Sequence, residues 1–169
     1  MIDVKGRLNK VFQSSEFKNS QIIDSDLYIR WIPLLICWLP DKSLGISEMG
    51  NWVVEEGSGL RILDTANSFL RIKVLLEKEF NDIRDTINIK LEAYKLDFDS
   101  IFPYRDLLEQ VIKNDSEYWV EQALRWYEGM PKETKIDLKE ALEMIQNKKT
   151  LSQKIRHKVI KELAQLKGQ

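Results

Sequence analysis

The stretch Ser116–Pro131, SEYWVEQALRWYEGMP, decides the fold class that the sequence predicts. Ser116 stands where a helix N-cap is expected, and Gly129 and Pro131 are stop signals at the other end. Between them the apolar side chains fall in two rows at helical spacing, Trp119, Ala123 and Trp126 in one and Val120, Leu124 and Tyr127 in the other. A helix that is apolar over more than half of its circumference is typically packed deeply against other elements.

The segments beside this stretch show the same helical pattern. Pro103 opens a predicted helix over 104–114, whose apolar positions fall on one face. A further helix is predicted over 135–147, and Thr150-x-x-Gln153 forms a capping box at the start of the last one. Because only short loops join these helices, we expect them to pack as antiparallel neighbours in stacked αα-hairpins.

The middle and the beginning of the chain also show helical spacing. Residues 60–94 carry apolar side chains at three- to five-residue steps. This spacing predicts one extended helix, or two helices with a break near Asn81-Asp82. Residues 4–12 fit a first helix.

The apolar run Leu27–Leu39 has two interpretations. It fits a buried helix kinked at Pro33 or a buried strand, and periodicity alone does not separate them. Residues 50–55 fit an isolated strand. We therefore expect a mainly α fold, in which residues 1–169 form a single domain. This domain is a bundle of antiparallel helices in stacked αα-hairpins, with a short strand or an irregular region within 20–58.

Composition indicates a folded protein in a reducing compartment. The chain has 169 residues, 43% hydrophobic and 31% charged, which excludes a disordered tail. Its single cysteine cannot form an intrachain disulfide, and small secreted domains usually contain several. The run Leu27–Leu39 is shorter than the ~20 residues that a membrane helix needs, and no signal-peptide stretch opens the sequence. We expect a cytoplasmic protein with no membrane partner.

Charge is distributed unevenly along the chain. The net charge is zero over 1–75, −6 over 76–128 and +5 over 129–169. Each of the last two regions could present a face of one sign to a partner, although such charges can also neutralise each other across a fold. We predict that partner-binding residues belong to the acidic region: Glu79, Asp82, Asp85, Glu117, Glu121 and Glu128.

The residues that could carry chemistry do not form a convincing catalytic set. His157, the only histidine, falls on the basic face of the last helix, with no carboxylate nearby in the sequence to orient it. Cys37 lies in the most apolar run, where a buried, unreactive thiol is expected. Asp97-x-Asp99 resembles the start of a calcium loop but lacks the glycine and the terminal glutamate, so helix capping is the simpler explanation. We predict no catalytic residues, no cofactor and no metal.

The basic segment Lys148–Lys167 is a weak candidate for binding nucleic acid. No aromatic side chain is interleaved with its cations for base stacking, and the sequence pI is about 6.0 rather than above ~9. Cations in a last helix also complement the helix dipole. Arg156 lies at the edge of the apolar stripe of this helix, where we expect its guanidinium to reach a carboxylate or a backbone carbonyl.

The C-terminal part resembles a known family. The segments Glu117–Trp119, Ala123–Trp126 and Leu151–Lys158 are similar to the tail of small helical bacterial immunity proteins, over about 50 of the 169 residues. The resemblance implies a non-enzymatic cytoplasmic inhibitor that forms a tight complex with a cognate toxin domain. Such domains are often nucleases with basic clefts, which an acidic stripe could occupy. The family has no shared catalytic residues, so the resemblance transfers no site.

Two alternatives to a toxin inhibitor remain open from the sequence. A helical-repeat adaptor would bind a peptide or another protein complex in a concave groove between its hairpins. A carboxylate-dependent metalloenzyme would use Asp97, Asp99 and a neighbouring glutamate.

Overall fold

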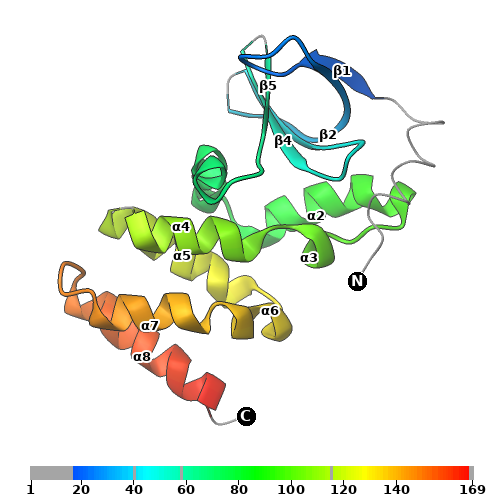
Figure 1. Cartoon of the computed structure of the whole chain (residues 1–169). Coiled ribbons are helices and arrows are strands. Elements are labelled where there is room, and N and C mark those ends of the chain that lie inside the picture. The colour runs from blue at the N-terminus through cyan, green and yellow to red at the C-terminus, as the bar shows by residue number, and fades with distance from the viewer. Residues whose placement is uncertain (1–16, 40, 58, 115, 168–169) are drawn as a thin grey trace. The chain divides into compact units, whose positions relative to one another are not determined.

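The computed structural model describes residues 17–39, 41–57, 59–114 and 116–167, with the side chains of 37–39 and 167 left out. Along the described residues, strands come first and helices follow (Figure 1). The chain forms two compact units, here called the sheet unit and the helical unit. The sheet unit comprises residues 1–71 and 82–102, and the helical unit comprises 72–81 and 103–169.

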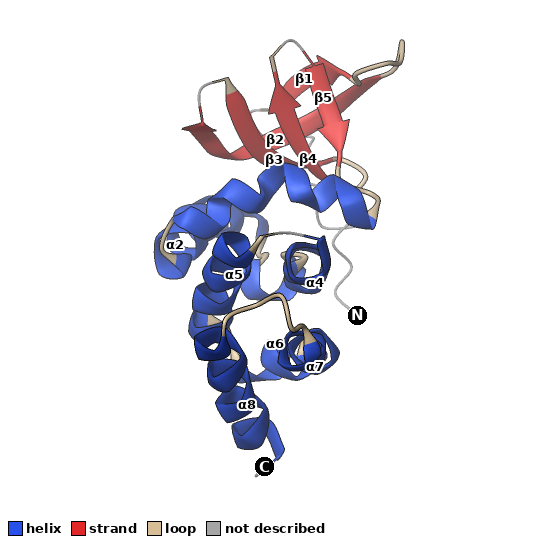
Figure 2. Cartoon of the chain, turned by 90° about the vertical axis from the view of Figure 1, so that its left-hand side faces the viewer, coloured by secondary structure: helices blue, strands red, loops and turns tan. Residues whose placement is uncertain are grey.

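The sheet unit is built on five antiparallel strands that follow one another in sequence order, drawn in red in Figure 2. The strands are β1 (Lys18–Gln21), β2 (Tyr28–Leu39), β3 (Lys42–Ser47), β4 (Trp52–Glu56) and β5 (Gly59–Ile62). The sheet curls so far that its two edges meet. Ile22 forms a parallel bridge with Leu60, and the Ile23 N–H donates to the Leu60 carbonyl at 2.9 Å.

This sheet shows that the predicted all-helical bundle is wrong. Of the two interpretations of Leu27–Leu39, the strand is confirmed, because residues 28–39 are β2. Residues 52–56 are not an isolated strand, since β4 pairs with both β3 and β5. Residues 60–62, expected at the start of a long helix, belong to β5. The first helix predicted over 4–12 lies outside the described residues.

Burial on both faces of the central part of the sheet explains why periodicity did not separate its strands from helices. Trp31, Val53 and Leu60 pack together inside the curl. Trp52 belongs to the opposite face, where its Nε1–H donates to the Ile101 carbonyl at 3.0 Å and its ring meets Phe102 edge-on. Strands covered on both faces read as continuous apolar runs rather than as an alternating pattern.

The helices follow the sheet along the chain. They are η1 (Ala66–Glu77, a 3₁₀ helix), α2 (Phe80–Leu91), η2 (Glu92–Tyr94), α3 (Phe98–Ile101), α4 (Tyr104–Asn114), α5 (Glu117–Gly129), α6 (Lys132–Asp137), α7 (Lys139–Asn147) and α8 (Gln153–Lys167). In the sheet unit, residues 82–102 supply the helical layer beside the sheet (Figure 1). There Lys90 donates to the Pro33 carbonyl at 3.2 Å, which ties α2 to β2.

The helices predicted in the second half agree better with the structure. The helix over 104–114 is confirmed as α4, and Ser116 is the N-cap of α5. The helix expected over 135–147 is instead two helices, α6 and α7, which meet at Leu138. The last helix begins at Gln153 rather than at Thr150.

The apolar rows of α5 form the centre of the helical unit. Five of their six side chains are at most 1% exposed: Val120, Ala123, Leu124, Trp126 and Tyr127. The sixth, Trp119, is half-buried. The Trp126 indole N–H donates to the Lys78 carbonyl at 2.9 Å, and Arg125 donates to the carbonyls of Leu76 and Glu77 at 3.1 Å. Helix α5 thus binds the carbonyls where η1 ends, and the break lies at 78–79 rather than at Asn81-Asp82.

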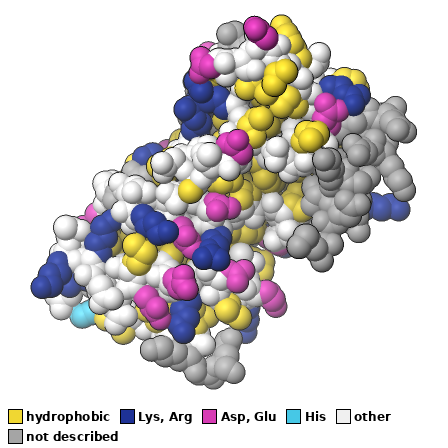
Figure 3. Space-filling view, viewed as in Figure 1, with side chains coloured by type: hydrophobic (Ala, Val, Ile, Leu, Met, Phe, Trp, Pro, Cys, Tyr) yellow, Lys and Arg dark blue, Asp and Glu magenta, His cyan; other side chains and the backbone are white. Residues whose placement is uncertain are grey.

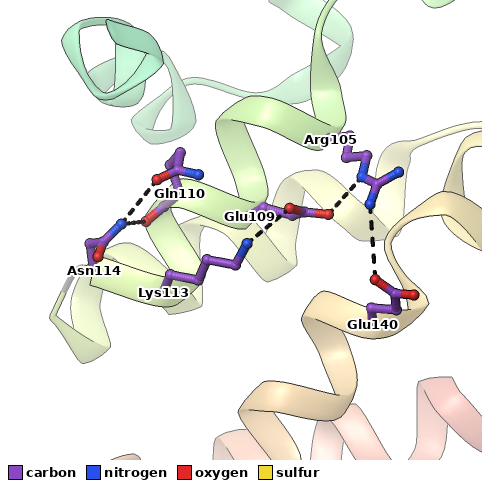
Figure 4. A network of polar contacts seen from close by, with 6 residues as sticks. All are labelled: Arg105, Glu109, Gln110, Lys113, Asn114 and Glu140. Atoms are coloured by element: carbon purple, nitrogen blue, oxygen red, sulfur yellow. Dashed lines mark hydrogen bonds and ion pairs between the residues drawn. The ribbon is translucent and has the colours of Figure 1, made fainter. Parts of the chain in front are cut away.

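Polar side chains on α4 pair with one another along the helix (Figure 4). Glu109 accepts from Arg105 Nε at 2.7 Å and from Lys113 Nζ at 3.1 Å, one turn away on each side. Partial burial opposes ionisation of Glu109, but the hydrogen bonds and charges of Arg105 and Lys113 outweigh it and hold its pKa below the ordinary 4.5. Part of the acidic character of the middle region is therefore neutralised locally.

Glu109→Gln is expected to lower the free energy of unfolding at pH 7 by about 0.5–1 kcal/mol. Because the folded-state pKa of Glu109 is below its unfolded value of about 4.5, this stabilisation is complete above that pH and is lost as pH falls through the folded-state pKa. Urea denaturation at pH 7 and at a series of pH values below 4.5 measures the difference, which should shrink as the pH falls. Glu140→Gln is the control, since its carboxylate is 84% exposed and 3.9 Å from Arg105. An equal loss of stability in Glu109→Gln and Glu140→Gln would contradict the conclusion that the pairing of Glu109 with Arg105 and Lys113 stabilises α4.

Candidate protein-binding surface

The three acidic residues predicted on α5 face the basic helix α8. Glu121 lies 3.2 Å from the Lys154 ammonium, and Glu128 lies 2.9 Å from that of Lys158. Glu117 accepts from the Ser152 backbone N–H at 3.3 Å, where α8 begins. The acidic and basic regions of the sequence therefore neutralise each other in part inside the helical unit. On the face drawn in Figure 3, cationic and anionic side chains of this unit are interspersed.

The basic tail has further partners within the helical unit. Lys148 donates to the Ile112 carbonyl at 3.0 Å and to the Lys113 carbonyl at 3.3 Å, near the end of α4. Cations are favourable at these positions because the last carbonyls of a helix carry partial negative charge. Arg156 does not follow the prediction: its Nε is buried and has no hydrogen-bond partner in the described part of the chain.

Glu79 belongs to the junction between η1 and α5. Its carboxylate is 3.8 Å from the Arg125 guanidinium, whose Nη2 also binds the carbonyls of Leu76 and Glu77. The Glu79 side chain is 69% exposed, so this ion pair is a weak one. The structure thus associates Glu79 with a junction of the helical unit, while Asp82 and Asp85 lie in the sheet unit.

Helix α2 and the first residue of η2 present three exposed carboxylates that have no ion-pair partner among the described residues. Asp82, Asp85 and Glu92 follow one another at helical spacing, and all three are exposed. No ion pair joins any of them to another described residue. The exposed Ile89 falls between Asp85 and Glu92 on the same face, with 75% of its surface accessible. These four residues are called the α2 stripe below.

The cations of α2 point away from this stripe. Arg84 pairs with Asp99 of α3 at 2.7 Å, and Lys90 reaches the Pro33 carbonyl of β2. Buried side chains occupy the sheet-facing side of the helix: Ile83, Ile87 and Leu91. Helix α2 is therefore apolar on one side and negatively charged on the other, and its own cations are used for packing.

A shallow hollow of about 590 Å³ adjoins the α2 stripe. It is lined by residues from the end of α2 and the segment after it: Asp85, Asn88, Ile89, Glu92, Lys95, Leu96 and Asp97. The walls are held in place, because the Asn88 side chain accepts from the Phe98 N–H at 2.8 Å. An exposed apolar side chain inside a rim of carboxylates suits a basic protein surface that offers an apolar side chain of its own.

The residues predicted from the sequence to bind a partner include two of the four residues in the α2 stripe. Asp82 and Asp85 were predicted, whereas Ile89 and Glu92 were not. A signal for Ile89 was present, because a helical wheel places it away from the buried row of Ile83, Ile87 and Leu91. An isoleucine on the polar side of an amphipathic helix is a candidate contact residue.

The residues considered for catalysis lie apart or have structural roles. Asp97 is the N-cap of α3, where it accepts from the Ser100 N–H at 3.1 Å, and Asp99 pairs with Arg84. In the described part of the chain no group of three or more His, Cys, Asp and Glu side chains could hold a metal ion. His157 is exposed on α8. Cys37 contributes backbone to β2, and its side chain lies outside the described residues.

Comparisons with known proteins do not place this chain in a family. No family model matches the chain. No curated protein and no solved structure matches it either. Among the described residues, no helix has both the length and the apolar character needed to cross a lipid bilayer. The likeness of the C-terminal part to immunity proteins therefore stays a prediction from the sequence.

Proposed function

We propose that this chain is a non-enzymatic protein that works by binding a partner protein through the α2 stripe. The observation that carries the proposal is the set of three carboxylates around exposed Ile89, none of which is paired with another described residue. An exposed like-charge row on one helix face is unfavourable by itself, and a cationic partner relieves that repulsion. The stripe is therefore suited to a basic partner.

Each part of the α2 stripe has its own role in such a complex. Asp82, Asp85 and Glu92 attract a basic surface over a distance of about 8 Å at physiological salt, which accelerates association and disfavours acidic competitors. Ile89 loses its exposed apolar surface on contact, which slows dissociation. Association should accordingly weaken as salt increases, and loss of Ile89 should mainly shorten the lifetime of the complex.

The partner that the sequence resemblance suggests is a cognate bacterial toxin domain. A nuclease toxin has a basic cleft, and a protein that covers such a cleft inhibits the enzyme without chemistry of its own. The α2 stripe provides the matching charge. The helical-repeat alternative required stacked hairpins along the chain, and the five-stranded sheet removes that basis.

The decisive experiment is co-expression with the toxin domain expected from the reading frame beside the gene. Colony survival and recovery of a 1:1 complex are measured in a heterologous bacterium, against the toxin domain alone. The variant Asp82→Lys/Asp85→Lys/Glu92→Lys is expected to lose rescue and to weaken binding by at least about 100-fold, because it reverses all three attractive charges. Ile89→Asp is expected to weaken binding about tenfold or more.

The matched control reverses the same number of charges elsewhere. Asp26→Lys/Asp64→Lys/Asp106→Lys changes three exposed carboxylates in three separate segments outside α2 and η2, and should keep rescue intact. Circular dichroism and thermal unfolding verify that every variant is folded. An equal loss of binding in both triple variants, or normal binding by the α2 variant, would refute the proposal that the α2 stripe is the binding surface. Absence of rescue by the wild-type chain would refute the toxin partner.

A further inference from the structure

The sequence before β1 carries the charge that complements the α2 stripe. Residues 1–16 lie outside the described residues. In the sequence, the segment 4–12 is VKGRLNKVF, which has three cations and no acidic side chain. The cations are Lys5, Arg7 and Lys10. Their combined charge is equal in size and opposite in sign to that of the three carboxylates of the α2 stripe.

The segment 4–12 also has apolar side chains that suit the α2 stripe. Val4, Leu8 and Val11 recur at i, i+4 and i+7, the spacing that places side chains on one face of a helix. In the α2 stripe, Ile89 is 75% exposed and lines the hollow of about 590 Å³. An apolar side chain that covers Ile89 removes apolar surface from water, which is favourable. Segment and stripe therefore match both in charge and in apolar character.

The start of the described chain lies close enough to α2 for a contact within one molecule. Strand β1 pairs antiparallel with the beginning of β2, so that Phe17, just before β1, lies toward Pro33. The Pro33 carbonyl accepts a hydrogen bond from Lys90 of α2 at 3.2 Å. The four residues 13–16 can extend over about 14 Å, and a helix with its side chains is about 10 Å wide. The segment 4–12 is thus able to reach the exposed face of α2.

We propose that the segment 4–12 binds the α2 stripe of its own chain. Its three cations pair with the carboxylates of the stripe, and Leu8 contacts Ile89. Ion pairs at a surface are individually weak, but attachment to the sheet unit gives the segment an effective concentration on the order of 1 mM. A contact whose dissociation constant would be about 1 mM between separate pieces is then formed half of the time.

The contact regulates access to the α2 stripe, a consequence that rests on the proposed function. A basic partner has to displace the segment 4–12 before it binds. If the contact is formed half of the time, its removal should lower the apparent dissociation constant of the partner complex about twofold. Basic surfaces that bind the stripe less tightly than the segment does are kept away, so the segment adds to selectivity.

The contact itself is tested without a partner, by nuclear magnetic resonance on the full-length chain. A nitroxide spin label is attached through Asn9→Cys in a Cys37→Ala background. In a helical projection Asn9 falls away from the apolar row of the segment, so the label leaves the contact surface intact. The amide signals of the α2 stripe are expected to lose most of their intensity with the active label and to regain it when the label is reduced.

Lys5→Glu/Arg7→Glu/Lys10→Glu, called the segment variant, reverses the three attractive charges. It should restore the amide signals of the α2 stripe in the presence of the active label, and high salt should do the same in the wild-type segment. The matched control makes the same charge change at three exposed cations of the helical unit, and it should leave the signal loss unchanged: Lys132→Glu/Lys149→Glu/Lys161→Glu.

Three outcomes would overturn the proposal. The active label could leave the α2 stripe signals at full intensity, or the segment variant could lose as much intensity as the wild-type segment. Alternatively, the loss could occur when the label and the isotope are on different molecules, which would place the segment of a second copy on the stripe. If the Cys37→Ala background does not fold, the Ile89 amide chemical shift of the unlabelled chain decides, since it should move in the segment variant and not in the control.

These outcomes are separable from the fate of the proposed function. Signals at full intensity would remove the segment from the α2 stripe and leave partner binding by the stripe untouched. A signal loss in a chain that does not bind the toxin domain would establish the contact and refute the proposed partner. A signal loss together with tighter toxin binding by the segment variant would support both.

Discussion

Trp126→Ala is expected to lower the free energy of unfolding by about 3–5 kcal/mol, enough to unfold a marginally stable domain. The Trp126 side chain is 0% exposed and packs edge-on against Phe80, with the ring centres 5.5 Å apart. Its indole N–H also donates to the Lys78 carbonyl at 2.9 Å. The substitution therefore leaves a large cavity and an unpaired carbonyl where η1 ends.

Trp126→Phe separates these two losses. Phenylalanine keeps most of the buried ring but has no N–H for the Lys78 carbonyl, so a loss of about 1–2 kcal/mol is expected. Chemical denaturation monitored by circular dichroism measures both variants. If the phenylalanine variant were as unstable as the alanine variant, the hydrogen bond would dominate and the packing argument would be wrong.

Gly45→Ala is expected to destabilise the sheet unit by about 3 kcal/mol or more, in spite of the small change. A Cβ atom at Gly45 would lie 2.2 Å from the Ile32 carbonyl oxygen and 2.6 Å from the Trp31 ring. The first of these is a backbone atom of the paired strand β2, which cannot turn aside as a flexible side chain can. Relief of the overlap requires β2 and β3 to separate.

Gly57→Ala provides the matched comparison. Gly57 has a φ of +58°, and no atom lies within 4 Å of the Cβ that alanine would add. The loss of folding free energy in Gly57→Ala therefore comes only from placing alanine in the left-handed backbone conformation, and is about 1–2 kcal/mol. Thermal unfolding of the two alanine variants should give a clearly larger loss for position 45. The reverse order would show that the curl of the sheet relaxes easily around Trp31.

Acidic side chains that look alike in the sequence have different surroundings on α2 and on α5. Glu121 and Glu128 looked equivalent to Asp82 and Asp85, because each is an exposed acidic side chain of a predicted helix. The structure assigns Glu121 and Glu128 to ion pairs with Lys154 and Lys158 of α8. Reversal of Glu121 would accordingly place two cations side by side within the helical unit.

Local sequence was sufficient for the helices of the second half. The caps, stop signals and apolar rows of Ser116–Pro131 predicted α5, and the helix over 104–114 coincides with α4. These helices bury one side of an amphipathic pattern, and that pattern is contained within one segment. Residues i, i+3, i+4 and i+7 are neighbours in space before any tertiary contact forms.

Tertiary structure decided the rest. Periodicity did not distinguish the strands because β3, most of β4 and residues 31–35 of β2 are largely buried, so their apolar runs carry no period that separates a strand from a helix. Pairing with distant segments, as between Ile22 and Leu60, selects the strand. The same holds for charge: whether a carboxylate is free or paired depends on which helix packs beside it. The sequence supplied the charges and the apolar rows, and the packing of α8 on α5 determined that Glu121 and Glu128 are paired with Lys154 and Lys158.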